Sequence, residues 1–152
     1  MKDIIEAFDN LMNGFEDVLS EMIDDGKIKS IHQMGVTKGT PKLPFLDIYT
    51  EEPFINIEDT GLSEIYEGEI IFATNVLNNK NPREGIRQAC EIISEVRNII
   101  THSRRLEQFG ISYIKTKTFG FVPYAFGKNE NIYGAGITFT IRFKLINPEC
   151  TK

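Results

Sequence analysis

Three small residues near the C-terminus, Gly134-Ala135-Gly136, are the first candidate for chemistry, because glycines at this spacing can bend a backbone around a phosphate. A phosphate-binding loop also needs an apolar strand before it, a helix N-terminus after it and usually a Lys-Ser or Lys-Thr pair, and none accompanies this stretch. Apolar side chains instead occupy the odd positions from Tyr133 to Leu145, and small or polar ones the even positions. This period of two predicts a strand that could span roughly 43 Å, longer than one domain usually needs.

Titratable side chains are the next candidates for chemistry. His32 and His102 are the only histidines, and neither lies in a nucleophile or metal motif. Two pairs of adjacent carboxylates also occur, Asp24 with Asp25 and Glu51 with Glu52. Neither pair predicts acid–base work without a pocket. We therefore expect a protein that is not an enzyme and that has no catalytic residues, no metal and no cofactor, with a small metal-dependent intracellular enzyme using its acidic loop as the alternative.

Aromatic side chains gather where the C-terminal hairpin should turn, a place where polar residues are usual. The residues that we expect at a contact with another subunit or with a tube are Phe119, Phe121, Tyr124, Phe126 and Tyr133, with Arg142 and Lys144 on the same hairpin. Exposed rings of this kind mark protein interfaces, although some of them will belong to the core. Stacking on single-stranded nucleic acid is the rival interpretation, but only Lys115, Lys117 and Lys128 lie among the rings.

Charge is divided unequally along the chain, whose net charge is −5. Residues 1–79 carry 16 acidic and 5 basic side chains, whereas residues 80–152 carry 6 and 12. Three interpretations follow: neutralisation within the fold, head-to-tail contact between copies, or a basic surface for nucleic acid. The acidic side chains concentrate between residues 51 and 69 and include Glu51, Glu52, Glu58, Asp59, Glu64 and Glu67. We expect this stretch to be an extended arm or ordered loop.

The remaining pattern indicates which elements position these residues. Apolar side chains at helical spacing predict helices over residues 2–26, ending at Gly26, and from an Asn81 cap to about residue 102. Strands are expected over 44–50 and 69–77, weakly over 27–36, and in a long hairpin after Gly110. The fold class is therefore α+β: a mixed, mostly antiparallel sheet of about four to five strands packed against two helices, with a long C-terminal β-hairpin and an extended acidic loop.

Composition is that of one domain spanning residues 1–152, with 41% hydrophobic and 26% charged residues. Cys90 and Cys150 have no metal or disulfide spacing, which favours a reduced, intracellular setting. No apolar run is long enough for a membrane span and no leader pattern is present, so we expect no membrane partner.

Four strings together resemble a known family: "PKLPFLDIYTEE", "IYEGEIIFATNVL", "NPREGIRQA" and "NIYGAGITFTIRFKL". From about residue 40 onward their order resembles that of tail terminator, or neck terminator, proteins of tailed bacteriophages and related phage-tail-like particles. The resemblance implies a hexameric ring that caps the tail tube, ends its polymerisation and forms the surface for joining the head. Another head–tail connector, head-completion or baseplate subunit of similar fold is the alternative.

The resemblance also implies partners and a location. They are other copies of the chain, the tail tube protein, the sheath and the head–neck connector proteins, in a virion assembled in the bacterial cytoplasm. DNA would pass through the ring without specific binding. Acidic side chains facing the lumen would suit that passage, because they repel phosphate.

Overall fold

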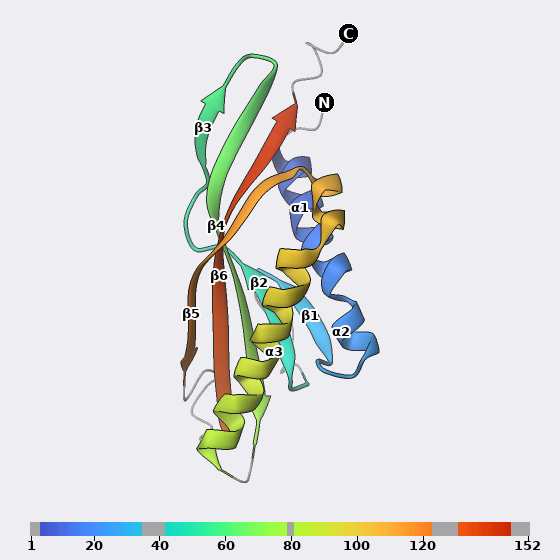
Figure 1. The fold of residues 1–152 in the computed structure, drawn as a ribbon, viewed down its shortest axis with the longest axis vertical. Helices are drawn as coiled ribbons and strands as arrows, with labels where there is room; N and C mark the ends of the chain where they lie inside the picture. Colours follow the sequence, from blue (N-terminus) through green and yellow to red (C-terminus); the bar gives the residue numbers. More distant parts are fainter. Residues whose placement is uncertain (1–3, 35–41, 79–80, 123–130, 147–152) are drawn as a thin grey trace.

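The computed structural model describes residues 4–34, 42–78, 81–122 and 131–146, and Figure 1 shows their arrangement. In chain order the elements are α1 (Ile4–Leu19), α2 (Glu21–Asp24), β1 (Ser30–Gln33), β2 (Phe45–Tyr49), β3 (Ile55–Asp59), β4 (Ser63–Leu77), α3 (Pro82–His102), the 3₁₀ helix η1 (Arg104–Phe109), β5 (Ile111–Val122) and β6 (Ile132–Ile146). The predicted α+β class and the C-terminal hairpin are confirmed.

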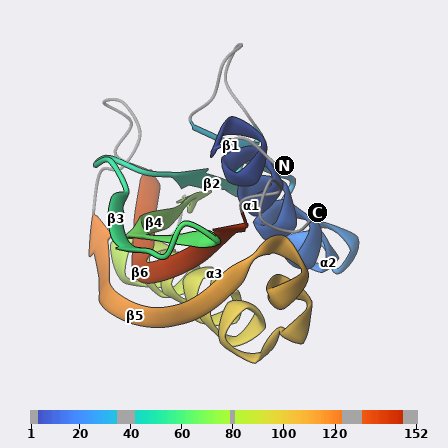
Figure 2. The ribbon, with the colours of Figure 1, turned by 90° about the horizontal axis from the view of Figure 1, so that it is seen from above.

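The strands form one sheet with the order β1-β2-β4-β6-β5, and β3 pairs with β4 beyond the end of β2. Only β1 and β2 are parallel; the other pairs are antiparallel. The described sheet has six strands where the sequence predicted four to five. Figure 2 shows that the sheet is curved and that α1 and α3 cover the same face, called here the helix side.

The core lies between this face and the two helices. Phe15 of α1 meets Phe72 of β4 edge to face at 5.2 Å between ring centroids, and Phe72 meets Phe139 of β6 in the same way at 5.5 Å. All three rings are fully buried. The odd positions of β6 point to the helix side, as the alternation in the sequence predicted, and Gly134 and Gly136 are strand residues rather than a phosphate loop.

The helix boundaries follow local sequence signals. The predicted first helix is interrupted at Ser20 and continues as α2, and Gly26 then ends it with a φ of +76°. Asp3 with Glu6 three residues later resembles a capping box for this helix, but Asp3 lies outside the described residues. Before α3, the Asn81 side chain accepts a hydrogen bond from the Glu84 backbone N–H at 2.7 Å, which confirms the predicted N-cap. The Asn81 N–H donates a hydrogen bond to Asn78 Oδ1 at 3.3 Å.

The acidic stretch includes a β-hairpin that extends from the sheet, which agrees with the expected extended arm and corrects the alternative of a loop. β3 pairs with the first part of β4 through a turn at residues 60–62, where Gly61 has a φ of +79°. β4 begins at Ser63, six residues before the predicted strand. All five side chains of β3 are exposed, so no face is selected for apolar residues and the period of two is lost.

Candidate functional site

A three-stranded extension of the sheet, called here the arm, is the most unusual feature of the molecule. It consists of β3, the turn at residues 60–62, residues 63–68 of β4 and residues 142–146 of β6, and its tip extends beyond the helices in Figure 1. Large apolar side chains on it are exposed: Ile55 (68%), Ile57 (45%), Leu62 (60%) and Ile146 (54%). The outer edge of β3 pairs with no other strand in the described part of the chain. Exposed apolar groups beside a free strand edge are typical of a contact surface.

Aromatic rings fix the base of the arm to the core. The Phe54 ring lies over Gly68 of β4 and contacts Phe8 and Phe143, with centroid distances of 6.1 and 5.4 Å. Tyr66 stacks on Phe143 at 5.6 Å, and its hydroxyl donates to a Glu64 carboxylate oxygen at 3.3 Å. Burial, and secondly the nearby Glu64 charge, raise the pKa of the Tyr66 phenol. The phenol therefore remains a neutral hydrogen-bond donor at physiological pH.

An apolar groove of about 370 Å³ opens between this aromatic base and the start of α1. Ile4, Ile5 and Phe8 line it from α1, and Pro53, Phe54 and Tyr66 line it from the arm side. Ile4 and Ile5 are 47% and 69% exposed. Thr50 and Glu52 also line this groove, called here the arm groove, but its surface is mainly apolar and can accept an apolar side chain.

Two other strands of the described sheet have a free outer edge, the short β1 and the longer β5. Phe119 and Phe121 are 53% and 55% exposed on β5. Their partners across the ladder, Ile137 and Ala135, are buried on the helix side, so both rings lie on the helix side at the margin of the sheet. They are available for contact, as the sequence suggested.

Other residues expected at the interface have different positions. Tyr133 is only 4% exposed and packs against Gly85 of α3, so its assignment to the interface is wrong and it belongs to the core. Tyr124 and Phe126 lie outside the described residues. Lys144 is exposed on β6, whereas Arg142 is half-buried: its guanidinium pairs with Glu67 at 2.6 Å and lies 4.7 Å from the Tyr113 ring centroid.

Ion pairs join the acidic and basic parts of the chain. Four of the five pairs among the described residues connect residues before 80 to residues after 80: Lys27–Glu95, Asp17–Arg105, Glu69–Lys117 and Glu67–Arg142. Neutralisation within the fold therefore accounts for part of the charge division. On the arm, Glu58 and Asp59 remain without an ion pair in the described part of the chain, and Lys115 on β5 does too.

The acidic residues predicted to face a lumen are divided between two faces. Glu51, Glu52, Glu58 and Asp59 are exposed, and Glu64 and Glu67 are half-buried. In the ladder Asp59 pairs with Glu64 on the helix side, whereas Glu58 pairs with Ile65 on the opposite face, which Glu67 also shares. The register therefore places Asp59 and Glu64 on one face and Glu58 and Glu67 on the other, while Glu51 and Glu52 lie outside the ladder. The lumen assignment of these residues stays a prediction.

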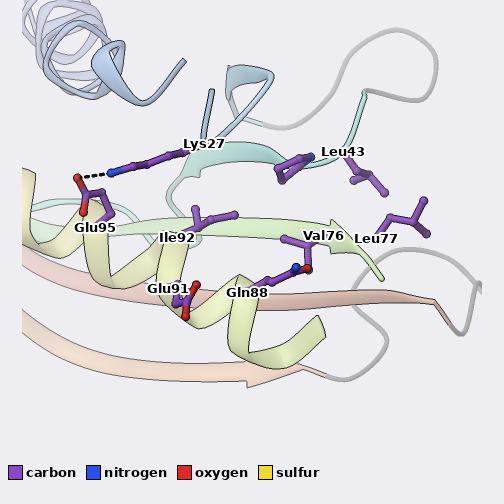
Figure 3. A pocket seen from close by; sticks show the side chains of 9 residues that line it. Lys27, Leu43, Val76, Leu77, Gln88, Glu91, Ile92 and Glu95 are labelled. Atoms are coloured by element: carbon purple, nitrogen blue, oxygen red, sulfur yellow. Dashed lines mark ion pairs between the residues drawn. The ribbon is translucent and has the colours of Figure 1, made fainter. Parts of the chain in front are cut away.

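A second groove, which the sequence did not indicate, lies between α3 and the ends of β2 and β4 (Figure 3). It has a volume of about 650 Å³, and Pro44, Leu77 and Ile92 are among its apolar lining residues. At one end Lys27 pairs with Glu95 at 2.9 Å, and this hydrogen bond raises the pKa of the Lys27 amine. Lys27 is thus a protonated partner of Glu95 at neutral pH.

The histidines make local contacts. His32 Nε2 lies 2.8 Å from Ser30 Oγ, and His102 Nδ1 lies 2.8 Å from the Asn98 carbonyl oxygen. Within the described ranges, no three His, Cys, Asp or Glu side chains come close enough to hold a metal ion. No helix among the described elements has the length and apolarity needed to cross a membrane.

Comparison with known proteins gives no family: no protein-family model matches the chain, and no curated protein is significantly similar to it. The arm, the free edges of β3 and β5 and the two grooves are therefore the features from which function is inferred.

Proposed function

We propose that this chain is a structural subunit that associates with copies of itself into a closed ring, of the kind formed by tail terminator proteins of tailed bacteriophages. In that role the ring caps the tail tube, stops its polymerisation and provides the surface to which the head joins. The observation that supports the proposal is the arm, which combines a free strand edge with exposed Ile55, Ile57 and Leu62.

Burial of these side chains in a contact would supply useful free energy. Fully burying an exposed Ile or Leu side chain contributes roughly 1.5–3 kcal/mol. Since the three side chains are between 45% and 68% exposed, docking would contribute roughly 1 kcal/mol from each. Backbone hydrogen bonds along the β3 edge would add to this, as they do when a strand is added to a sheet.

The ring proposal implies partners above and below the subunit plane. The tail tube protein, the sheath and head–neck connector proteins are the partners of such a ring, and DNA passes through it without specific binding. The particle itself, assembled in the bacterial cytoplasm, is then the place where the chain resides.

Self-association is the direct test. We expect mass photometry over a concentration series to show a closed oligomer, and negative-stain electron microscopy to show a ring with a central pore. Adding the chain to polymerising tail tube protein should give tubes of arrested length. An Ile57→Asp chain should lose both effects, whereas Ile23→Asp, which changes an exposed apolar residue of α2 away from the arm, should keep them. A chain that stays monomeric with and without tubes, and leaves tube growth unchanged, would refute the proposal.

A further inference from the structure

We propose that the joint between neighbouring copies is formed by the β5 edge of one copy and the β3 edge of the next. This inference rests on the proposed function and specifies the surface that performs it. The partner is a second copy of this chain, docked head to tail, with Lys115 opposite Glu58 and with Phe119 and Phe121 entering the arm groove.

Strand directions allow this joint. In the arm and its continuation the strands lie in the order β3-β4-β6-β5, and each is antiparallel to the next. β3 and β5 therefore run in opposite directions at opposite margins of the sheet. When β5 of one copy meets β3 of another, the antiparallel pattern continues across the joint, and the free N–H and C=O groups of both edges can pair.

Charge selects this joint over the symmetric alternatives. β3 carries Glu58 and Asp59, and β5 carries Lys115 and Lys117. Two β3 edges or two β5 edges would place like charges opposite each other, which is destabilising, whereas β3 against β5 places opposite charges together. Since Lys117 already pairs with Glu69, Lys115 is the β5 cation left for the neighbour.

The ladder gives Glu58 and Lys115 compatible positions. Glu58 pairs with Ile65 of β4, which in turn pairs with Lys144 of β6. Lys115 pairs with Thr140 of β6. Both side chains therefore point to the face opposite the helices. Each strand also has a bulge at the matching place, between Asn56 and Glu58 in β3 and between Thr116 and Thr118 in β5.

The distance between these levels suits a closed ring. Lys144 and Thr140 are four positions apart along β6, so pairing Lys115 with Glu58 offsets each copy from its neighbour by four residues along the strands. One copy contributes four strands to this sheet, and the average offset is therefore one residue per strand. A rise of about 3.3 Å per residue and a strand spacing of about 4.8 Å convert this shift into a strand tilt of about 35°. Closed barrels have tilts of about 35–45°, so pairing Glu58 with Lys115 gives the stagger that closure requires.

The same register brings apolar groups together. With Lys115 of one copy opposite Glu58 of the next, Thr118 lies opposite Ile55. Strand β5 of the first copy then continues past Phe54 and Pro53 at the base of the other copy's arm. Phe119 and Phe121 lie on the helix side, which is also the side on which Ile4 and Ile5 of α1 line the arm groove. Two exposed rings on one edge thus meet an apolar groove beside the other.

Disulfide trapping tests the joint. In a chain whose natural cysteines are removed by Cys90→Ser and Cys150→Ser, one population carries Glu58→Cys and a second carries Lys115→Cys. We expect oxidation of the mixture to give a covalent dimer of the two populations, and either population alone to give almost none. Arg97→Cys, on an exposed cation of α3, replaces Lys115→Cys as the matched control and should not trap.

Charge reversal gives an independent readout. Glu58→Lys or Lys115→Glu alone should weaken self-association by roughly threefold to tenfold, and both changes in one chain should restore it, because each joint regains an opposite pair. Arg97→Glu should have no effect. If the wild-type chain forms rings while neither trapping nor reversal behaves in this way, the β3–β5 joint is refuted and the ring remains. A wild-type chain that does not self-associate refutes the ring as well.

Discussion

Replacing Gly68 by alanine should disrupt the aromatic packing at the base of the arm and lower the stability of the fold. Gly68 lies within β4, and a Cβ added there would be 2.6, 2.7 and 2.8 Å from three ring atoms of Phe54. Real Cβ atoms do not approach other atoms so closely, so the Phe54 ring has to move. Because Phe8 and Phe143 hold the ring from two sides, it cannot move without disturbing them as well.

The expected cost follows from overpacking. Forcing an extra carbon into a packed site typically costs about 1–3 kcal/mol. In a chain of 152 residues, 1 kcal/mol lowers the melting temperature by roughly 2–4 °C, so Gly68→Ala should melt roughly 2–12 °C below the wild type. Differential scanning calorimetry measures this directly. Gly120→Ala is the control, because a Cβ at this β5 glycine meets nothing within 4 Å, and it should melt at the wild-type temperature or slightly above.

A double-mutant cycle identifies the cause. If the clash with Phe54 is responsible, Gly68→Ala should cost almost nothing in a Phe54→Ala background, giving a coupling of about 1–3 kcal/mol between the two sites. An equal cost of Gly68→Ala in both backgrounds would show that the ring is not the obstacle. A Gly68→Ala chain as stable as the wild type would refute the reasoning altogether.

Three further predictions concern other parts of the fold. Gly85→Ala in α3 should lower the melting temperature although alanine is the better helix former by about 1 kcal/mol, because its Cβ would lie 2.1 Å from Tyr133 Cδ2; stabilisation on calorimetry would contradict this. Asn81→Ala should cost about 1 kcal/mol through loss of the N-cap bond to the Glu84 N–H, whereas Asn81→Asp should stay near the wild type; equal urea midpoints for all three chains would refute the cap. Burial raises the pKa of Tyr66, so in a difference titration of wild type against Tyr66→Phe at 295 nm its phenol should ionise above the ordinary pKa of 10.0. The contribution of this phenol to stability should be complete below pH 10 and disappear as the pH rises through the raised pKa. Titration at the ordinary pKa would refute its burial.

The sequence predicted the elements whose side chains meet a buried face. In β6 apolar and polar residues alternate, and in α1 and α3 apolar residues recur at helical spacing, because these positions are buried against the core. The sequence therefore predicted these elements and most of their boundaries. β3 was missed for the same reason, because all five of its side chains are exposed and show no such pattern. A strand held mainly by ladder hydrogen bonds leaves little trace in the order of apolar and polar residues.

Rings that lie over glycines were also invisible in the sequence. Gly14 lies under Phe109, Gly68 under Phe54 and Gly85 under Tyr133, and each pair joins residues that are far apart in the sequence. No local sequence feature shows that a glycine packs under an aromatic ring from a distant part of the chain. For this reason the sequence assigned Tyr133 to an interface, although it is buried. Phe119 and Phe121 do not pack over a glycine in the described structure, and both are exposed.

The placement of the aromatic base has a consequence for how the chain orders itself. Between the helices and the sheet, burial of large side chains supplies most of the free energy of folding, while β3 beyond Phe54 buries none of its side chains. Regions with few buried contacts open with lower free energies than the core. Within the described sheet we therefore expect the end of the arm to open with a lower free energy than the core, and a neighbour that covers it would stabilise it at the moment of assembly.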